Sequence, residues 1–187
     1  KVFARFVENG VHLKAKKCLF MRKEIAFLGK VITPNGVKPD PRKTQALERM
    51  PAPKDKKQLR SALGSFGFYR QWIPAYSALT KPLTDLLQNN VRWHWSSDCQ
   101  GAWLELKKKL ASAPVLAHVD WSRPFILETD ASPVGLAGVL SQPQADGAEH
   151  PVCFISRTLT TGEKNYHQFR REALALVWSL DVLHHYL

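Results

Sequence analysis

Two acidic residues in the last third of the chain have the types and the placement that metal-dependent chemistry needs. Asp130 ends a stretch of alternating polarity that predicts a β-strand, and Glu172 lies near the start of a predicted helix. If that helix packs on the sheet, the two carboxylates meet, and their repulsion requires a neutralising cation. Carboxylate oxygens suit Mg²⁺, and paired ions about 3.5–4 Å apart serve the in-line hydrolysis of phosphodiesters.

A purely structural interpretation of these two residues stays open. Asp130 is placed to cap a turn with Ser132, and Glu172 is placed to face solvent beside Arg170 and Arg171. Spacing alone favours this second interpretation, because acidic residues are common on the exposed faces of helices.

Three residues of a predicted long helix form a second candidate site. Arg60, Gly64 and Phe68 recur every fourth residue, so they share one helix face, which is separate from the apolar stripe. A glycine inside a helix costs about 1 kcal/mol relative to alanine and needs a reason. Close approach of a nucleic-acid backbone is one such reason, and packing of a neighbouring helix is the other.

The formal net charge of +11 lies entirely in the first third of the chain. Residues 1–60 contain 16 Lys/Arg and 5 Asp/Glu, a difference of +11, whereas residues 61–187 contain 11 of each. A basic region beside a neutral one indicates a polyanionic partner, with nucleic acid as the leading candidate. A solvated basic surface that keeps the chain soluble is the alternative.

The composition excludes several classes of protein. Six Trp, nine Phe and four Tyr carry too much apolar surface for a disordered polycation. No apolar run approaches the roughly 18 residues that span a membrane, and no signal peptide opens the chain. The scattered cysteines at 18, 99 and 153 predict buried thiols in a reducing compartment. Because Lys1 is not an initiator methionine, we expect a piece of a longer protein. The cysteines and the lack of a signal peptide lead us to expect that this protein is intracellular and not secreted.

The first 50 residues predict short elements of both kinds. An apolar helix face at residues 2–7 precedes two strand-like runs, 13–21 and 25–32. We interpret these runs as a β-hairpin that ends at the turn 34–36. Asp40 followed by Pro41 predicts a helix that continues to about residue 50, since Asp is a good cap and Pro suits the first helical turn.

The rest of the chain predicts helices first and strands afterwards, which is typical of an α+β fold. The predicted helices cover residues 55–72, 77–87 and 98–111, and a last helix runs from about 167 to the end. Between them, the predicted strands cover residues 125–130, 136–142 and 152–156.

The order of many short motifs is more specific than any single one of them. They are Lys17-Cys18-Leu19-Phe20, Phe27-Leu28-Gly29, Val37-Lys38-Pro39-Asp40-Pro41, Leu59-Arg60-Ser61, Leu63-Gly64, Phe68-Tyr69-Arg70, Ile73-Pro74, Pro82-Leu83-Thr84, Ala113-Pro114-Val115-Leu116, Glu128-Thr129-Asp130-Ala131-Ser132, Glu163-Lys164-Asn165-Tyr166 and Glu172-Ala173-Leu174-Ala175. In this order they resemble the Pol polyproteins of gypsy-like long-terminal-repeat retrotransposons. The resemblance begins after the polymerase active site of the reverse transcriptase and runs into the ribonuclease H domain.

The resemblance implies four regions along the chain. Residues 1–36 would be the end of the palm with the primer-grip hairpin, residues 37–88 the helical thumb, and residues 89–120 the connection. Residues 121–187 would be the first part of a ribonuclease-H-like domain. The implied fold is α+β, with a β-hairpin and a helical thumb and connection, followed by an incomplete unit of three antiparallel strands and a helix.

The resemblance also assigns roles to individual residues. Nucleic-acid binding falls to seven of them, which are Lys17, Phe27, Leu28, Gly29, Arg60, Gly64 and Phe68. Of these, residues 27–29 would form the primer grip, which positions the end of the growing strand. Asp130 and Glu172 match the first two catalytic, metal-binding carboxylates of ribonuclease H, with Mg²⁺ or Mn²⁺ as the cofactor of the parent enzyme.

Other parts of the family pattern do not occur in these 187 residues. The Tyr-x-Asp-Asp pair of the polymerase and the later ribonuclease H carboxylates are absent. We therefore expect the parent polyprotein to synthesise DNA and to hydrolyse the RNA of a hybrid. We expect this fragment to bind RNA–DNA hybrid or DNA duplex without catalysis, with the rest of the Pol polyprotein as its protein partner. We expect its location to be the cytoplasm, in a virus-like particle, or the nucleus.

Two alternatives to this hypothesis stay open. A domesticated, non-enzymatic protein would use the same fold to bind a protein partner, for example by adding a strand to an exposed sheet edge. A residual nuclease would take its third metal ligand from another chain.

Overall fold

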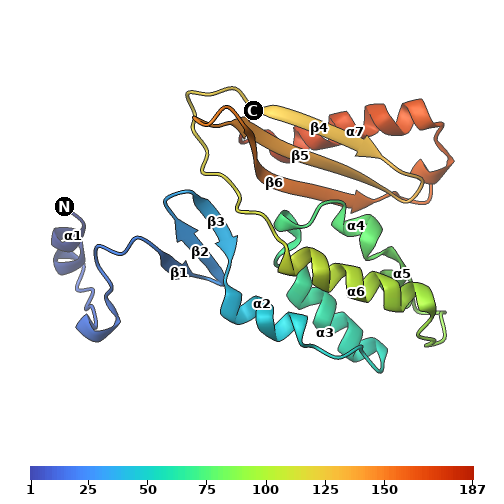
Figure 1. Ribbon diagram of the computed structural model, residues 1–187, viewed down its shortest axis with the longest axis horizontal. Helices are drawn as coiled ribbons and strands as arrows, with labels where there is room; N and C mark the ends of the chain where they lie inside the picture. Colours follow the sequence, from blue (N-terminus) through green and yellow to red (C-terminus); the bar gives the residue numbers. More distant parts are fainter.

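The computed structural model describes all 187 residues as two three-stranded antiparallel sheets with a group of helices beside them (Figure 1). The first sheet contains β1 (Ile25–Phe27), β2 (Lys30–Thr33) and β3 (Gly36–Pro39). The second contains β4 (Ile126–Ala131) and, beyond it, β5 (Gly135–Pro143) and β6 (Glu149–Thr158). This architecture confirms the predicted α+β fold class.

The first sheet differs from the hairpin that we expected. Residues 13–21 form no strand, because the segment contains only a short 3-10 helix at Ala15–Lys17 and its apolar side chains find no partner strand. The run predicted as one strand at 25–32 turns at Leu28 and Gly29, whose φ angles are +47° and +79°. These two residues close a tight hairpin in which Phe27 pairs with Lys30. The turn at 34–36 then leads to β3 instead of ending the sheet.

The helices largely confirm the capping signals of the sequence. A short α1 (Val2–Glu8) opens the chain, and its predicted apolar face stays unburied. Asp40 caps α2 (Pro41–Glu48) by accepting from the Arg42 N–H at 3.0 Å. Asp55 caps α3 (Lys56–Gly67) by accepting from the Gln58 N–H at 2.7 Å. α6 (Ser97–Ala111) begins after Ser96, whose hydroxyl accepts from the Cys99 N–H at 3.3 Å.

Two predicted helix lengths were wrong. α3 ends at Gly67, and the chain continues as the 3-10 helix η2 (Arg70–Trp72). The helix expected at 77–87 is divided into α4 (Tyr76–Leu79) and α5 (Lys81–Asp85). Pro82 accounts for the break, because proline lacks an N–H and its ring clashes with the carbonyl four residues before it.

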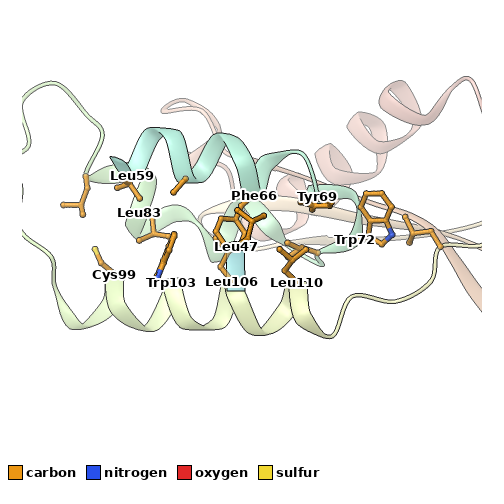
Figure 2. Packing of buried hydrophobic residues seen from close by; sticks show 14 residues of the cluster. Leu47, Leu59, Phe66, Tyr69, Trp72, Leu83, Cys99, Trp103, Leu106 and Leu110 are labelled. Carbon is orange, nitrogen blue, oxygen red and sulfur yellow. The ribbon is translucent and has the colours of Figure 1, made fainter. Parts of the chain in front are cut away.

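The helices share one hydrophobic core, in which α3 and α6 face each other (Figure 2). Leu59 and Phe66 of α3 and Trp103 and Leu106 of α6 are at most 1% exposed, and the Phe66 and Trp103 rings meet edge to face at 5.4 Å. Leu59 and Phe66 are seven residues apart and Trp103 and Leu106 three apart, which are the spacings that place side chains on one face of a helix.

α7 (Gln168–Leu183), which follows the 3-10 helix η3 (Glu163–Asn165), covers one face of the second sheet. Ala131 of β4 packs with Ala175 of α7. A Cβ added at Gly138 would lie 2.9 Å from the Ser179 hydroxyl, so a small residue is needed where helix and sheet approach.

The opposite face of the second sheet meets the helices directly. Phe154 of β6 packs against the core of the helical part. The Ser77 N–H and hydroxyl both donate to the Ser156 hydroxyl, at 3.0 and 2.9 Å, and the Arg70 guanidinium donates to the Ser156 carbonyl. The helices and the second sheet are therefore in contact through both apolar and polar groups.

An isolated bridge joins the outer edge of the first sheet to the segment that follows α6. The Val37 N–H donates to Leu116 O at 2.7 Å, and the Leu116 N–H donates to Val37 O at 2.9 Å. Gly36, with φ +138°, makes this approach possible, since a Cβ there would lie 2.1 Å from the Leu116 carbonyl oxygen. None of the helices is long and apolar enough to cross a lipid bilayer.

Candidate nucleic-acid interface and carboxylate pair

The turn between β1 and β2 presents two apolar side chains to solvent. Phe27 is 57% exposed and Leu28 is 73% exposed. The backbone beneath them is held, because Gly29 O accepts from the Asp40 N–H at 3.0 Å and from the Tyr69 hydroxyl at 3.2 Å. A held turn with exposed apolar tips is suited to contact with a ligand, because it loses little conformational entropy on binding.

The outer face of α3 is open along its length. Arg60, Gly64 and Phe68 are all exposed, and Arg60 pairs with no acidic side chain. No atom of the chain lies within 4 Å of the position that a Cβ would take at Gly64. Within this chain, packing of a neighbouring helix therefore does not explain this glycine.

The structure brings the turn and the helix face together at Phe68. Its ring lies 3.2 Å from the position that a Cβ would take at Gly29. The Lys30 ammonium lies 5.8 Å from the centre of the Phe68 ring and 5.2 Å from the Trp72 ring, within cation–π range. Lys17, by contrast, lies exposed in the 3-10 helix that precedes the sheet.

Sequence reasoning missed Lys30 and Tyr69, which connect the β1–β2 hairpin to the end of α3. Both depend on the approach of β2 to the end of α3, between residues about 40 positions apart. The motif Phe68-Tyr69-Arg70 contained Tyr69, but no local pattern shows that its hydroxyl reaches the hairpin.

Asp130 and Glu172 lie at the same end of the second sheet but belong to different layers. Ala131 packs against α7, and neighbouring side chains of a strand alternate, so the exposed Asp130 points to the other face of β4. Glu172 is half-buried on α7 and accepts from the Gln168 side-chain amide. The same amide donates to Ala131 O at 2.9 Å, which links Glu172 to the strand end beside Asp130.

Asp130 and Glu172 depart in two details from the purely structural interpretation, which otherwise stays open. Ser132 forms the turn by itself, since its hydroxyl accepts from the N–H groups of Val134 and Gly135. Glu172 accepts a hydrogen bond from the Gln168 side-chain amide, so solvent is not its only contact. No group of three or more His, Cys, Asp or Glu side chains lies close enough together to hold a metal ion.

Comparisons with known proteins agree with this architecture. Residues 95–187 match the family model described as an RNase H-like domain found in reverse transcriptase. The whole chain is 38% identical to the retrovirus-related Pol polyprotein from transposon 297 of Drosophila melanogaster, of which it covers 17%. The chain is thus similar over its full length to a part of this retrotransposon Pol polyprotein. The corresponding protein of transposon opus, from the same organism, is 36% identical over the whole chain, which covers 20% of it.

Solved structures of a retroviral enzyme share the fold of this chain. A foamy viral protease–reverse transcriptase in complex with double-stranded DNA matches 96% of the chain with a TM-score of 0.79 and 26% identity. Another, in complex with an RNA/DNA hybrid, matches 90% with a TM-score of 0.74 and 26% identity. The chain covers 32% and 23% of these two proteins, so it spans a third or less of each relative described here.

Proposed function

We propose that the chain binds RNA–DNA hybrid or DNA duplex through one continuous surface, which we call the α3–hairpin face. It consists of the β1–β2 turn at residues 27–29 and of Arg60, Gly64 and Phe68. The observation that carries the proposal is the open glycine at position 64, flanked by an unpaired cation and an exposed ring. Without a Cβ, the helix offers a site where a sugar-phosphate backbone can approach closely.

Further observations support this proposal. The charge excess of the chain lies within residues 1–60, which contain the turn and the first five residues of α3. Lysine and arginine side chains neutralise phosphates and supply most of the non-specific affinity of proteins for nucleic acid. Lys17 is one of the basic residues in this region. The foamy viral relatives of the same fold are complexes with hybrid and with duplex DNA.

The boundaries and the metal chemistry belong to the same proposal. We assign residues 1–36 to the palm, 37–88 to the thumb, 89–120 to the connection, and 121–187 to the ribonuclease-H-like domain. Asp130 and Glu172 carry hard oxygen donors of the kind that Mg²⁺ or Mn²⁺ prefers. Because Asp130 points away from the face of β4 that α7 covers, we assign the two carboxylates as metal ligands only in the complete domain. The ion would act as a Lewis acid in phosphodiester hydrolysis when the domain is complete within its polyprotein.

The three free cysteines are the observation that bears on the cellular setting. We place the protein inside the cell, in the cytoplasm or the nucleus, where thiols stay reduced. No observation favours the alternative of a domesticated protein that acts only through a protein partner.

A salt titration tests the binding surface. The wild-type chain should bind duplex DNA with an affinity that falls steeply with salt, by a log–log slope of about −0.9 for each phosphate neutralised. Arg60→Gln should weaken binding severalfold and reduce the slope by about 0.9, because it removes one such contact.

Arg92→Gln is the matched control, since Arg92 is an exposed arginine in the neutral part of the chain. It should leave both affinity and slope unchanged. Salt-independent binding by the wild type, or equal effects of the two variants, would contradict the α3–hairpin face.

A further inference from the structure

Tyr69 connects the end of α3 to the β1–β2 turn. Its side chain is only 4% exposed, and its hydroxyl donates to Gly29 O at 3.2 Å. Burial and the charge of Asp40 raise the pKa of this hydroxyl, so it stays protonated and remains a donor at neutral pH. This hydrogen bond joins residues 40 positions apart in the sequence, so it links two elements that are distant along the chain.

The turn needs such support because little else holds it. All three residues of β1 are exposed, and β1 is an edge strand of the first sheet. Short hairpins are marginally stable without packing on one face. Leu28 and Gly29 have positive φ angles, and a leucine in this conformation is strained, so surrounding contacts must hold the turn.

We infer that Tyr69 is a positioning residue for nucleic-acid binding. Its hydroxyl, together with the Asp40 N–H, fixes Gly29 O, and the Phe68 ring then contacts the turn from the adjacent position of the chain. Leu28 and Phe68 are thereby held as parts of one surface before the duplex arrives. This inference rests on the proposed function, because it assigns to Tyr69 the preorganisation of the α3–hairpin face.

Preorganisation predicts a specific pattern of losses. Without the hydroxyl, the turn samples more conformations, and ordering it again on binding lowers the affinity. Tyr69 itself contacts no phosphate in this arrangement, so the salt dependence of binding should stay as it is. A hydrogen bond of typical strength, about 1 kcal/mol, corresponds to about a fivefold change in affinity.

The test compares Tyr69→Phe with Tyr76→Phe. The Tyr76 hydroxyl also donates to a backbone carbonyl, that of Leu63 at 3.3 Å, but it lies away from the hairpin. Both variants lose one hydroxyl and keep the ring, so they are matched in chemistry. Two quantities are measured for each: the dissociation constant for an RNA–DNA hybrid, and hydrogen exchange of residues 25–33 without nucleic acid.

We expect Tyr69→Phe to weaken hybrid binding about fivefold, with an unchanged salt slope, and to speed exchange at the turn. Tyr76→Phe should change neither quantity. If Tyr69→Phe keeps wild-type binding and exchange, or if both variants lose affinity equally, the positioning role is wrong while the proposed function stands. A wild-type chain that fails to bind hybrid, with the turn still loosened in Tyr69→Phe, contradicts the proposed function instead.

Discussion

At the scale of single residues, the ion pair between Arg157 and Glu163 joins the end of β6 to η3. The two guanidinium nitrogens donate to the two carboxylate oxygens at 2.7 and 2.9 Å. The Thr160 N–H adds a third hydrogen bond to the carboxylate, at 2.8 Å. The bonds from Arg157 and then that from Thr160 lower the pKa of Glu163 from 4.5 to about 2.

Glu163→Gln should destabilise the protein in a pH-dependent way. A lowered pKa in the folded state means that the ionised group stabilises the fold above pH 4.5, and that this contribution is lost as the pH falls towards 2. We expect the variant to be less stable by about 1 kcal/mol at pH 7, since partly exposed pairs contribute modestly, and equal to the wild type near pH 2. Urea denaturation at several pH values measures this.

Glu105→Gln serves as the control, because Glu105 meets only Lys108 and Lys109 on the surface of α6, at 4.0 and 3.8 Å. It should change stability little at any pH. A deficit of Glu163→Gln that is the same at pH 7 and pH 2.5 would exclude the ion pair as its cause.

The predictions for single residues succeeded where they depended on one element. Helical spacing placed Arg60, Gly64 and Phe68 on a common open face, because that spacing is fixed by the helix itself. The relation of Asp130 to Glu172 was beyond such reasoning, since alternation alone does not say which face of β4 a helix will cover. Their roles as metal ligands stay a prediction.

At the scale of elements, α3 combines a buried stripe with a glycine that weakens the helix. Gly64→Ala should raise stability by about 1 kcal/mol, or a melting temperature by about 2–4 °C, because alanine favours the helix and the added methyl meets nothing. The same methyl should lower duplex affinity severalfold, because it occupies the site of close backbone approach. Thermal melting and binding measured on one sample separate the two effects.

Gly101→Ala in α6 is the matched control, since a Cβ at Gly101 also meets nothing within 4 Å. It should stabilise the protein to a similar degree and leave binding unchanged. Unaltered binding by Gly64→Ala would remove the main reason for assigning nucleic acid to this helix face.

The elements that were predicted well carry their own boundary signals. Asp40 before Pro41 and Asp55 before Gln58 are caps whose hydrogen bonds are local, so α2 and α3 begin where the sequence indicates. The apolar run at 13–21 has no such signal. A strand forms only where another strand pairs with it. The residues at 13–21 do not by themselves indicate whether such a partner lies nearby.

At the scale of the whole molecule, the contact of Ser77 with Ser156 joins the helices to the second sheet. Ser156→Ala leaves both the N–H and the hydroxyl of Ser77 without their acceptor. We expect a loss of about 1–3 kcal/mol, as for buried polar groups that lose a partner. Urea denaturation, with Ser65→Ala as the control, measures it.

Ser65 suits this comparison because its hydroxyl donates only to Ser61 O within α3 and is exposed. Its replacement should change stability by less than about 0.5 kcal/mol. Equal effects of the two substitutions would mean that the Ser77 contact contributes little, and that the packing of Phe154 and the hydrogen bond from Arg70 to the Ser156 carbonyl hold the helices and the second sheet together.

The bridge between Val37 and Leu116 has a consequence for how the chain can be shortened. Leu116 occupies hydrogen-bonding groups on the outer edge of β3, which would otherwise be free to pair with a strand of another molecule. A truncated polypeptide that ends after α6 keeps every helix of the core but uncovers that edge. We expect such a product to self-associate through β3, which a measurement of its molecular mass in solution would check.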